Sequence, residues 1–407
     1  MIVSRRKNML KMIVFISLLG VSAFADMTSF YKTALKNLAY DKSYSLAETA
    51  NQTSQSAVTY SKYANFSVDA AYSKTYAKLL PTAPGSFNTS DITLHDTLDL
   101  FGKNNYKIQT LRLDTKAKKS RLNLKKEQLF IALANMVALY NKTAAELKIH
   151  QELYNQQQKI YKKLEALSQD GDITEIEILR FKNTLTTLQT SIISKAQELA
   201  KMKAQLQLYA PNENIPKLTQ TQLLYTKKDF LAHNPKARMN EIDAKKLLAE
   251  SKGFNNTYIP TLDVGVAYEK LDDPTAYGDN HSFGIALHMP LNGGDFKEAE
   301  ALKVASLSKQ TQRTEYKLQR QNEYIGHYQA YVNAKKQLLV LQKAVGDFEK
   351  SEATIQKAYL RQYVDFNTYL QVLKQALDVK TQIISMQAQE CVQATIINAI
   401  ASGKIYE

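Results

Sequence analysis

Apolar and polar side chains alternate along four short stretches of the chain, and these stretches come in two pairs. Strict alternation over about ten residues indicates a β-strand with one apolar and one polar face. Asp96 is an exception, because it falls on the apolar side of its stretch. The pattern therefore predicts two strand pairs, at about 65–77 with 90–100 and at about 260–270 with 282–291.

Each strand pair is followed by an unusually long stretch with helical periodicity. Residues 104–169 contain no glycine or proline, and residues 296–362 contain only Gly326 and Gly346 of these two types. An α-helix rises 1.5 Å per residue, so the first stretch would form a helix about 100 Å long. Apolar residues recur at heptad spacing in both stretches, which predicts helices that pack side by side as coiled coils.

The two halves of the chain are tandem repeats. A shift of 196 residues places Val68 on Val264 and Tyr72 on Tyr268. Each half has the same order: a helix, a strand, a loop, a strand, a long helix, a tight turn and a returning helix. The predicted organisation is a first repeat at 26–208, an equatorial segment between the repeats at 209–235, and a second repeat at 236–407 with its returning helix at 365–402.

The first 25 residues have the three parts of an export signal. Arg5, Arg6 and Lys7 lie near its start, an apolar core follows, and Ala23 and Ala25 form an A-x-A cleavage site. Removing the four cations of this signal lowers the formal charge from +14 to +10. Export argues against nucleic acid as a partner, and the remaining cations are scattered among Glu and Gln along the helices.

The mature chain has no candidate membrane-spanning helix in its sequence. Beyond the signal, no segment has the roughly 18 consecutive apolar residues that such a helix needs. Its single cysteine, Cys391, cannot form an intramolecular disulfide and lies in an apolar helix stripe. A mature chain that spans a membrane must therefore use strands. Lipid does not tolerate unpaired strand edges, and closure takes at least about eight strands, so two or three copies would have to join.

Two segments of the second repeat carry a family resemblance. The strand IPTLDVGVAYEK at 259–270 and the strand FGIALHMPLNGGDFKEA at 283–299, with Pro290, Leu291, Gly293 and Gly294, resemble the TolC-type outer-membrane efflux proteins, also called outer membrane factors. The resemblance extends over about 28–402. It includes the helix turns GDITEIEIL at 171–179 and QYVDFNTYL at 362–370, although Gln362 stands where the family has glycine. In the first repeat, Ala64 stands for Pro260 and Thr97 for Pro290.

The resemblance implies a mainly α-helical fold with a membrane β-barrel. Long coiled-coil helices in a tandem repeat would build a tunnel through the periplasm, and four strands per chain would complete a 12-stranded barrel in a homotrimer in outer-membrane lipid. It implies a channel that conducts small molecules or ions from the periplasm to the exterior, with a periplasmic adaptor (a membrane fusion protein) and an inner-membrane pump as partners. The loops at 79–88 and 271–280 would face the outside of the cell.

No motif in the sequence indicates catalysis. It contains no H-E-x-x-H, no phosphate-binding glycine loop, no C-x-x-C and no nucleophile elbow. We therefore expect no enzyme activity, no cofactor and no metal site, and we interpret Asp170-Gly171-Asp172 as a turn rather than a calcium loop.

The resemblance places a gate at the periplasmic helix turns, where family members often carry acidic residues. The corresponding positions here are Glu177 in the first turn and Thr368 and Gln371 in the second, with Asp365 as an alternative source of charge. Glu177 and Asp365 have a second interpretation, as acids that favour the N-terminus of a returning helix.

Two histidines complete the set of candidate residues. His95 and His288 fall on the polar, lumen-facing side of their strands, so a trimer would gather six imidazoles. Ordinary polar lumen positions are the simpler interpretation, and a metal-binding or pH-sensitive ring is the alternative.

Other functions remain open at this point. The same channel could serve type I protein secretion, and the transported substrate is not encoded in any motif. A periplasmic coiled-coil adaptor or structural protein would explain the signal and the helices, but not two matched strand pairs.

Overall fold

The computed structural model describes residues 20–80, 83–169, 173–219, 222–273, 276–290 and 292–407. The chain forms two compact units. We call Met1–Tyr40, Asn123–Asn234 and Leu318–Glu407 the helical unit, and Asp41–Leu122 and Pro235–Lys317 the strand unit. The predicted export signal lies mostly outside the described residues, and Gly20 begins the first described helix.

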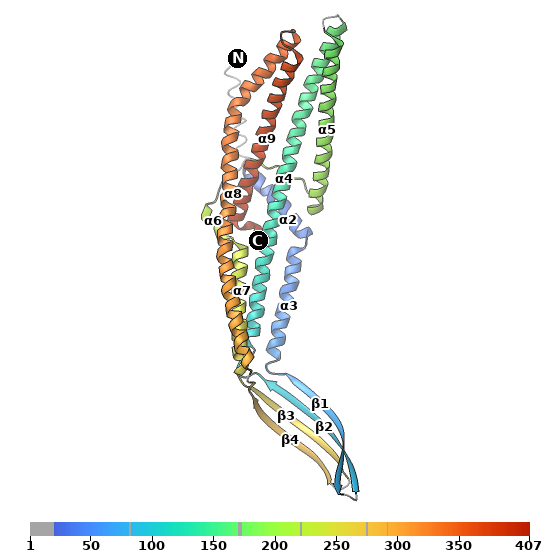
Figure 1. Cartoon of the computed structure of the whole chain (residues 1–407), viewed down its shortest axis with the longest axis vertical. Coiled ribbons are helices and arrows are strands. Elements are labelled where there is room, and N and C mark those ends of the chain that lie inside the picture. The colour runs from blue at the N-terminus through green and yellow to red at the C-terminus, as the bar shows by residue number, and fades with distance from the viewer. Residues whose placement is uncertain (1–19, 81–82, 170–172, 220–221, 274–275, 291) are drawn as a thin grey trace. The chain divides into compact units, whose positions relative to one another are not determined.

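The strand unit contains an antiparallel sheet in which the two repeats are joined. Its strands are β1 (Phe66–Leu80), β2 (Ala83–Leu98), β3 (Thr261–Asp273) and β4 (Ala276–His288). They follow the order β1-β2-β3-β4, so the first hairpin pairs with the second through β2 and β3 (Figure 1).

The strands run further toward the hairpin loops than the sequence predicted. Strand β2 begins at Ala83 instead of about 90, and β4 begins at Ala276 instead of about 282, so most of the expected loops at 79–88 and 271–280 is strand. The polar residues of these segments continue the antiparallel ladder. Pro84 is accommodated because it lies beside a register shift, in a part of β2 that pairs only with β1. Residues 81–82 and 274–275 lie outside the described residues.

The alternation of the four strands is in register across the sheet. One cross-strand row joins Val68, Leu94, Val266 and Phe283, and these side chains are 66%, 42%, 51% and 67% exposed. The neighbouring row on the opposite face joins Ser67, His95, Gly265 and Gly284. The sheet therefore has one polar face and one apolar face that this chain leaves uncovered.

Asp96, the exception on the apolar side, has a local structural role. Its Oδ1 accepts the backbone N–H of Asn65 at 2.9 Å, directly before β1 begins. The carboxylate thereby satisfies a backbone donor that the sheet ladder leaves free.

Four helical segments belong to the strand unit: α3 (Tyr40–Tyr60), the first part of α4 (Asn105–Gln169), α7 (Pro235–Asn255) with the short helix η1 (Asn256–Tyr258), and the first part of α8 (Gly293–Leu360). Asp114 of α4 links the first three, because its carboxylate accepts hydrogen bonds from Asn51 Nδ2 at 3.1 Å and Lys246 Nζ at 3.3 Å. The helix bounds agree closely with the predicted starts at 104 and 296.

Both long helices begin with a side chain that caps the free backbone N–H groups. Buried Asp99 accepts the N–H of Lys103 at 2.7 Å and that of Asn104 at 2.8 Å. In the second repeat, Asn292 Oδ1 accepts the N–H of Gly294 at 3.1 Å. These caps explain why each strand passes into a helix within a few residues.

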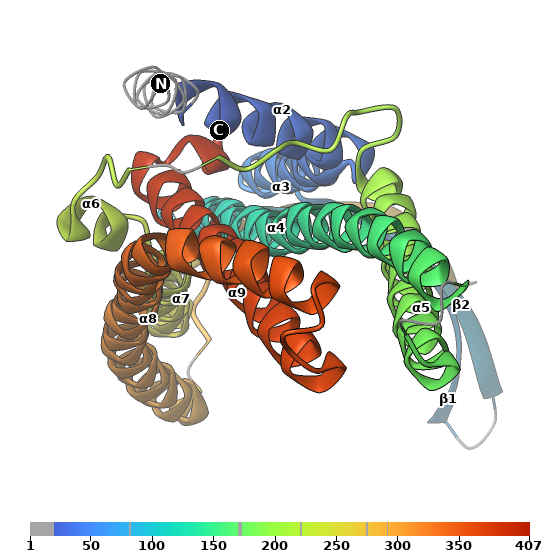
Figure 2. The same ribbon diagram turned by 90° about the horizontal axis from the view of Figure 1, so that it is seen from above.

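The helical unit contains α2 (Gly20–Asn37), the remainder of α4 and α8, α5 (Glu175–Tyr209), α6 (Lys227–Ala232), α9 (Phe366–Ser402) and the C-terminal turn η2 (Lys404–Tyr406). Helix α5 runs back along α4, and α9 runs back along α8 (Figures 1 and 2). The unit thus has two helical hairpins. No helix in the described part of the chain is long and apolar enough to cross a membrane.

The main core of the helical unit lies where α2, α4, α9 and the inter-repeat segment meet. Phe30 and Tyr31 of α2 pack with Phe130 of α4 and Ile396 of α9, and all four side chains are buried. Polar side chains hold the inter-repeat segment against this core. Asn398, for example, accepts the N–H of Leu224 and donates to the carbonyl of Gln222, both at 2.8 Å.

Candidate functional site at the helix turns

The turn between α8 and α9 and the start of α9 contain three of the four predicted gate residues. Asp365 is the N-cap of α9: its Oδ1 accepts the N–H of Thr368 at 2.9 Å, and its Oδ2 accepts the Thr368 hydroxyl at 2.8 Å. The backbone N–H of Thr368 stabilises the ionised form and lowers the pKa of Asp365 below its ordinary value. Gln371 is exposed one helical turn further on. The structure therefore makes Asp365 and Thr368 partners in a helix cap.

The position before this cap has the backbone conformation that favours glycine. Gln362 has a φ of 60°, and its N–H bonds to the carbonyl of Tyr359 at 2.9 Å. A side chain in this left-handed region costs roughly 1–2 kcal/mol. The glycine of the family pattern thus has a physical reason, and Gln362 occupies the site at a cost in strain.

The turn between α4 and α5 has a matching cap. Thr174 is the N-cap of α5, and its hydroxyl accepts the N–H of Glu177 at 3.4 Å. Glu177 is half-buried in the first turn of α5, where a carboxylate is favoured by the helix dipole. Residues 170–172, with the predicted Asp-Gly-Asp turn, lie outside the described residues.

Five aromatic side chains join the two hairpins beside these turns. We call them the aromatic cluster: Tyr161, Phe181, Tyr359, Phe366 and Tyr369. Phe181 of α5 is buried, with its ring centroid 6.5 Å from that of Tyr359, 5.8 Å from that of Phe366 and 6.4 Å from that of Tyr369. Tyr359 and Tyr369 stack at 4.7 Å with an interplanar angle of 8°. The first hairpin thus inserts a ring among the rings of the second.

The two stacked tyrosines differ in their hydroxyl groups. Tyr369 donates to Gln157 Oε1 of α4 at 2.6 Å, which adds a polar link between the hairpins. The buried Tyr359 hydroxyl has no hydrogen-bond partner within the described structure. Burial, and then the nearby Glu177 carboxylate, raise the pKa of Tyr359 to about 12. Tyr359 is therefore neutral at every physiological pH.

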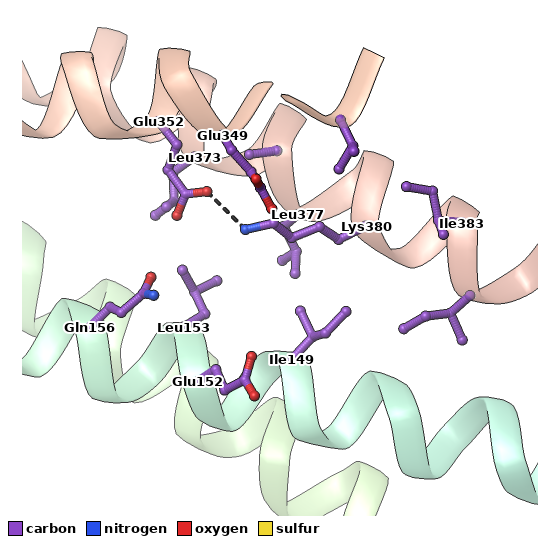
Figure 3. A pocket seen from close by; sticks show the side chains of 13 residues that line it. Ile149, Glu152, Leu153, Gln156, Glu349, Glu352, Leu373, Leu377, Lys380 and Ile383 are labelled. Atoms are coloured by element: carbon purple, nitrogen blue, oxygen red, sulfur yellow. Dashed lines mark hydrogen bonds and ion pairs between the residues drawn. The ribbon is translucent and has the colours of Figure 1, made fainter. Parts of the chain in front are cut away.

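A groove further along separates the hairpins (Figure 3). It has a volume of about 460 Å³ and is lined by α4 on one side and by α8 and α9 on the other. Ile149 and Leu153 face Leu377 across it, and Lys380 Nζ pairs with Glu352 at 2.9 Å between α9 and α8. Packing between the hairpins is close at the aromatic cluster and open at this groove.

The histidines predicted to face the lumen lie on the polar face of the sheet, in different rows. His95 is level with Gly265 and Gly284, whereas His288 is level with Thr261, four residues away along β3. At about 3.3 Å per residue this is about 13 Å along the strand. This register does not match a ring of six imidazoles that needs His95 and His288 in one cross-strand row. Among the described residues, no group of three or more His, Cys, Asp or Glu side chains is placed to hold a metal ion.

The linear sequence pattern did not predict the aromatic cluster or the role of Gln157. One signal was available: each turn is flanked by aromatics within about ten residues, Tyr161 and Phe181 around the first and Tyr359, Phe366 and Tyr369 around the second. Nothing in the linear pattern shows that the two sets meet, because they lie almost 200 residues apart.

Comparisons with known proteins establish the fold. No family model matches the chain, and no curated protein matches it in sequence. Among solved structures, the outer-membrane channel OprN is similar with a TM-score of 0.78 at 13% identity, over 95% of this chain and 92% of that one. The outer membrane protein VceC of Vibrio cholerae gives 0.70 at 12% identity, over 93% and 96%. The open state of the MtrE outer membrane channel of Neisseria gonorrhoeae gives 0.67 at 13% identity, over 92% and 89%.

The chain therefore has the fold of these outer-membrane channels over nearly its whole length. The predicted class, long paired helices in a tandem repeat with four strands, is confirmed.

Proposed function

We propose that this chain is one subunit of a homotrimeric outer-membrane channel that conducts small molecules or ions out of the periplasm. The observation that carries the proposal is the sheet of the strand unit. One face carries a band of exposed apolar side chains, among them Val68 and Phe283, and the sheet has two open edges, β1 and β4. In water such a face promotes aggregation, whereas in lipid it is the expected outer surface of a barrel.

The open edges require further copies of the chain. No strand edge is tolerated in lipid, so β1 of one subunit must pair with β4 of the next until the barrel closes. Four strands per chain give eight strands with two copies and twelve with three. Similarity to the fold of OprN and VceC supports three, with the helical units forming a tunnel in the periplasm.

The opposite face of the sheet supports a water-filled passage. Its side chains include Asp69, Asp91 and Glu269, together with His95 and His288, and these are polar groups that lipid would exclude. Efflux through such a passage requires a pump in the inner membrane and an adaptor between the two. We infer both as partners by analogy with the fold, and we infer no catalysis by this chain.

The helix turns form the periplasmic gate in this proposal. Three copies would bring Glu177, Asp365 and Gln371 to the end of the tunnel, and the aromatic cluster would set how far apart the two hairpins of each subunit can stand. Asp365 has a second task as helix cap, so its charge and its hydrogen bonds must be tested separately. Thr368 acts as the donor to that cap.

The charge of the gate is tested with Asp365→Asn and Glu177→Gln in planar bilayers. Asparagine keeps an oxygen for the N–H of Thr368, so the variant removes charge while the cap remains. A reduced preference for cations over anions supports the acidic gate. Unchanged selectivity in the double variant rejects it and leaves Asp365 as a helix cap and Glu177 as an acid in the first turn of its helix.

The channel itself is tested by native mass in mild detergent after extraction from purified outer membranes. Three chains per particle, with ion conductance on reconstitution, support the proposal. A monomer released without detergent would instead favour a periplasmic coiled-coil protein. Type I protein secretion is a second use of the same channel, and it is distinguished by co-purification with a polypeptide-exporting pump.

A further inference from the structure

All four passages between sheet and helices lie at one end of the sheet. The first residues of β1 and β3 lie beside the last residues of β2 and β4. The pairs Leu98 with Leu262 and Thr261 with His288 show this. The antiparallel topology therefore gathers the end of α3, the start of α4, the end of α7 and the start of α8 at this edge. We call residues 60–66, 96–107, 252–261, 288–290 and 292–298 the junction.

The junction exposes large apolar and aromatic side chains. Seven of them are more than half exposed: Tyr60, Tyr63, Phe66, Leu100, Phe101, Met289 and Phe296. Two aromatic rings from different segments are held in place, because Tyr258 stacks on Phe296 with centroids 4.6 Å apart and donates its hydroxyl to the carbonyl of Asn292 at 2.6 Å. Exposed apolar side chains are therefore found in the junction as well as on the sheet.

The acids and the cations of the junction differ in how exposed they are. Its carboxylates are Asp96, Asp99, Asp295 and Glu298, and the first three accept hydrogen bonds from backbone or Asn side-chain N–H groups. Asp99 and Asp295 are also buried.

The cations of the junction are Lys62, Lys103, Lys107, Lys252 and Lys297. Lys107, Lys252 and Lys297 are exposed, and Lys62 and Lys103 are half-buried. Lys297 forms a surface ion pair with Glu300 at 3.2 Å, which is open to solvent and adds little. Two of the four acids, Asp99 and Asp295, are thus buried at the helix starts, whereas Glu298 and three of the five lysines are exposed.

We propose that the junction binds the anionic phospholipid headgroups of the membrane leaflet that meets this end of the sheet. The inference rests on the proposed function, because it requires the sheet to lie in a bilayer. An apolar face, then a band of Tyr and Phe, then exposed lysines is the order of groups that matches hydrocarbon, interface and anionic headgroup. A protein partner would match the apolar patch but would give no reason for the same order in both repeats.

The test uses the full-length protein reconstituted from an equimolar mixture of phosphatidylglycerol and phosphatidylcholine. The composition of the lipid that stays bound after detergent extraction is measured by native mass spectrometry. The test variant replaces Lys107, Lys252 and Lys297 by Gln. The control replaces three exposed lysines of the helical unit, Lys162, Lys182 and Lys203, by Gln and so makes the same change in net charge.

We expect the wild-type protein and the control to retain phosphatidylglycerol over phosphatidylcholine at least about tenfold better than the junction variant. The preference should fall as salt is raised, because the headgroups and lysines meet at an exposed surface. Equal retention by all three proteins overturns the inference, and so does equal loss in both variants, which would reflect net charge alone.

Failure of this inference is distinguishable from failure of the proposed function. Wild-type protein that inserts and conducts without any preference for phosphatidylglycerol refutes the junction site and leaves the channel in place. Wild-type protein that does not insert into the mixed bilayer refutes both.

Discussion

Replacing Phe181 by Ala should shift the channel toward its open state more strongly than it destabilises the fold. The ring is buried and lies within 6.5 Å of the rings of Tyr359, Phe366 and Tyr369, which belong to the other hairpin. Removal of a buried Phe side chain costs about 3–5 kcal/mol, because the transfer energy is lost and a cavity remains. In each subunit, this loss of free energy destabilises the state in which the hairpins are packed together.

The size of the expected effect follows from how much of this packing is lost on opening. If all of it is lost, about 3 kcal/mol per subunit shifts the closed-to-open equilibrium by about two orders of magnitude. A loss of only about 1.4 kcal/mol still shifts this equilibrium about tenfold. The groove beside α4, α8 and α9 gives the hairpins room to move, since packing there is already open.

The assay is the open probability of reconstituted channels in planar bilayers, with Phe130→Ala as the matched control. Phe130 is as deeply buried as Phe181 and packs edge-on against Tyr31 at 5.2 Å, in the core formed with α2. Both variants should lose thermal stability, and only Phe181→Ala should raise the open probability. The reasoning is refuted if the two variants raise it equally, or if Phe181→Ala is destabilised yet remains closed.

The remaining predictions concern the same turns and the C-terminus. Tyr359→Phe should raise thermal stability, because it removes a buried hydroxyl without a hydrogen-bond partner in the described structure, whereas Tyr369→Phe should lower it by about 1 kcal/mol with the loss of a hydrogen bond. Gln362→Gly should relieve left-handed strain and stabilise the protein by about 1 kcal/mol in thermal melts. Gly403→Ala should lower thermal stability, since Gly403 has a φ of 73° and its Cβ would lie 2.7 Å from an imidazole carbon. The lowered pKa of Asp365 means that its cap is fully formed above the ordinary aspartate value and is lost only as pH falls below about 4, so conductance between about pH 5 and pH 7 should not depend on it.

Each of these changes has a comparison that can contradict it. The two tyrosine variants control for each other, and a shift of the same sign in both would show that the hydroxyl contacts do not matter. Gly346 is helical with open space around its Cα, so Gly346→Ala should stabilise where Gly403→Ala destabilises. A conductance step between about pH 5 and pH 7 that disappears in Asp365→Asn would mean that the carboxylate titrates far above its expected range.

The sequence was most informative where one pattern determines one interaction. Alternation with a period of two predicted the faces of all four strands, since a one-residue slip would turn Val68 or Val266 to the polar side. It failed at the strand ends, because polar residues such as Asn88 and Asp272 pair across β2 and β3 as well as apolar ones do. Backbone pairing does not require apolar side chains, so composition alone misplaces the loops.

The candidate site was less predictable, for a physical reason. Glu177 and Asp365 were identified by position, but the cap bonds from the Glu177 N–H to the Thr174 hydroxyl and from the Thr368 N–H to Asp365 exist only when the helix starts are formed. The contact of Phe181 with Tyr369 depends on how two hairpins pack, and no local pattern encodes it.

The two departures of the first repeat from the family pattern have a common explanation in hydrogen bonding. Ala64 donates its N–H to the carbonyl of Tyr60 at 3.0 Å, a bond that proline at this position would remove. Thr97 continues β2 and pairs with Asp263, because β2 lies inside the sheet, whereas its counterpart Pro290 comes after the edge strand β4 has ended. Proline is tolerated at the edge and excluded from the interior of a sheet. The first repeat therefore lacks proline at the two positions where it would disturb the end of α3 or the pairing of β2 with β3.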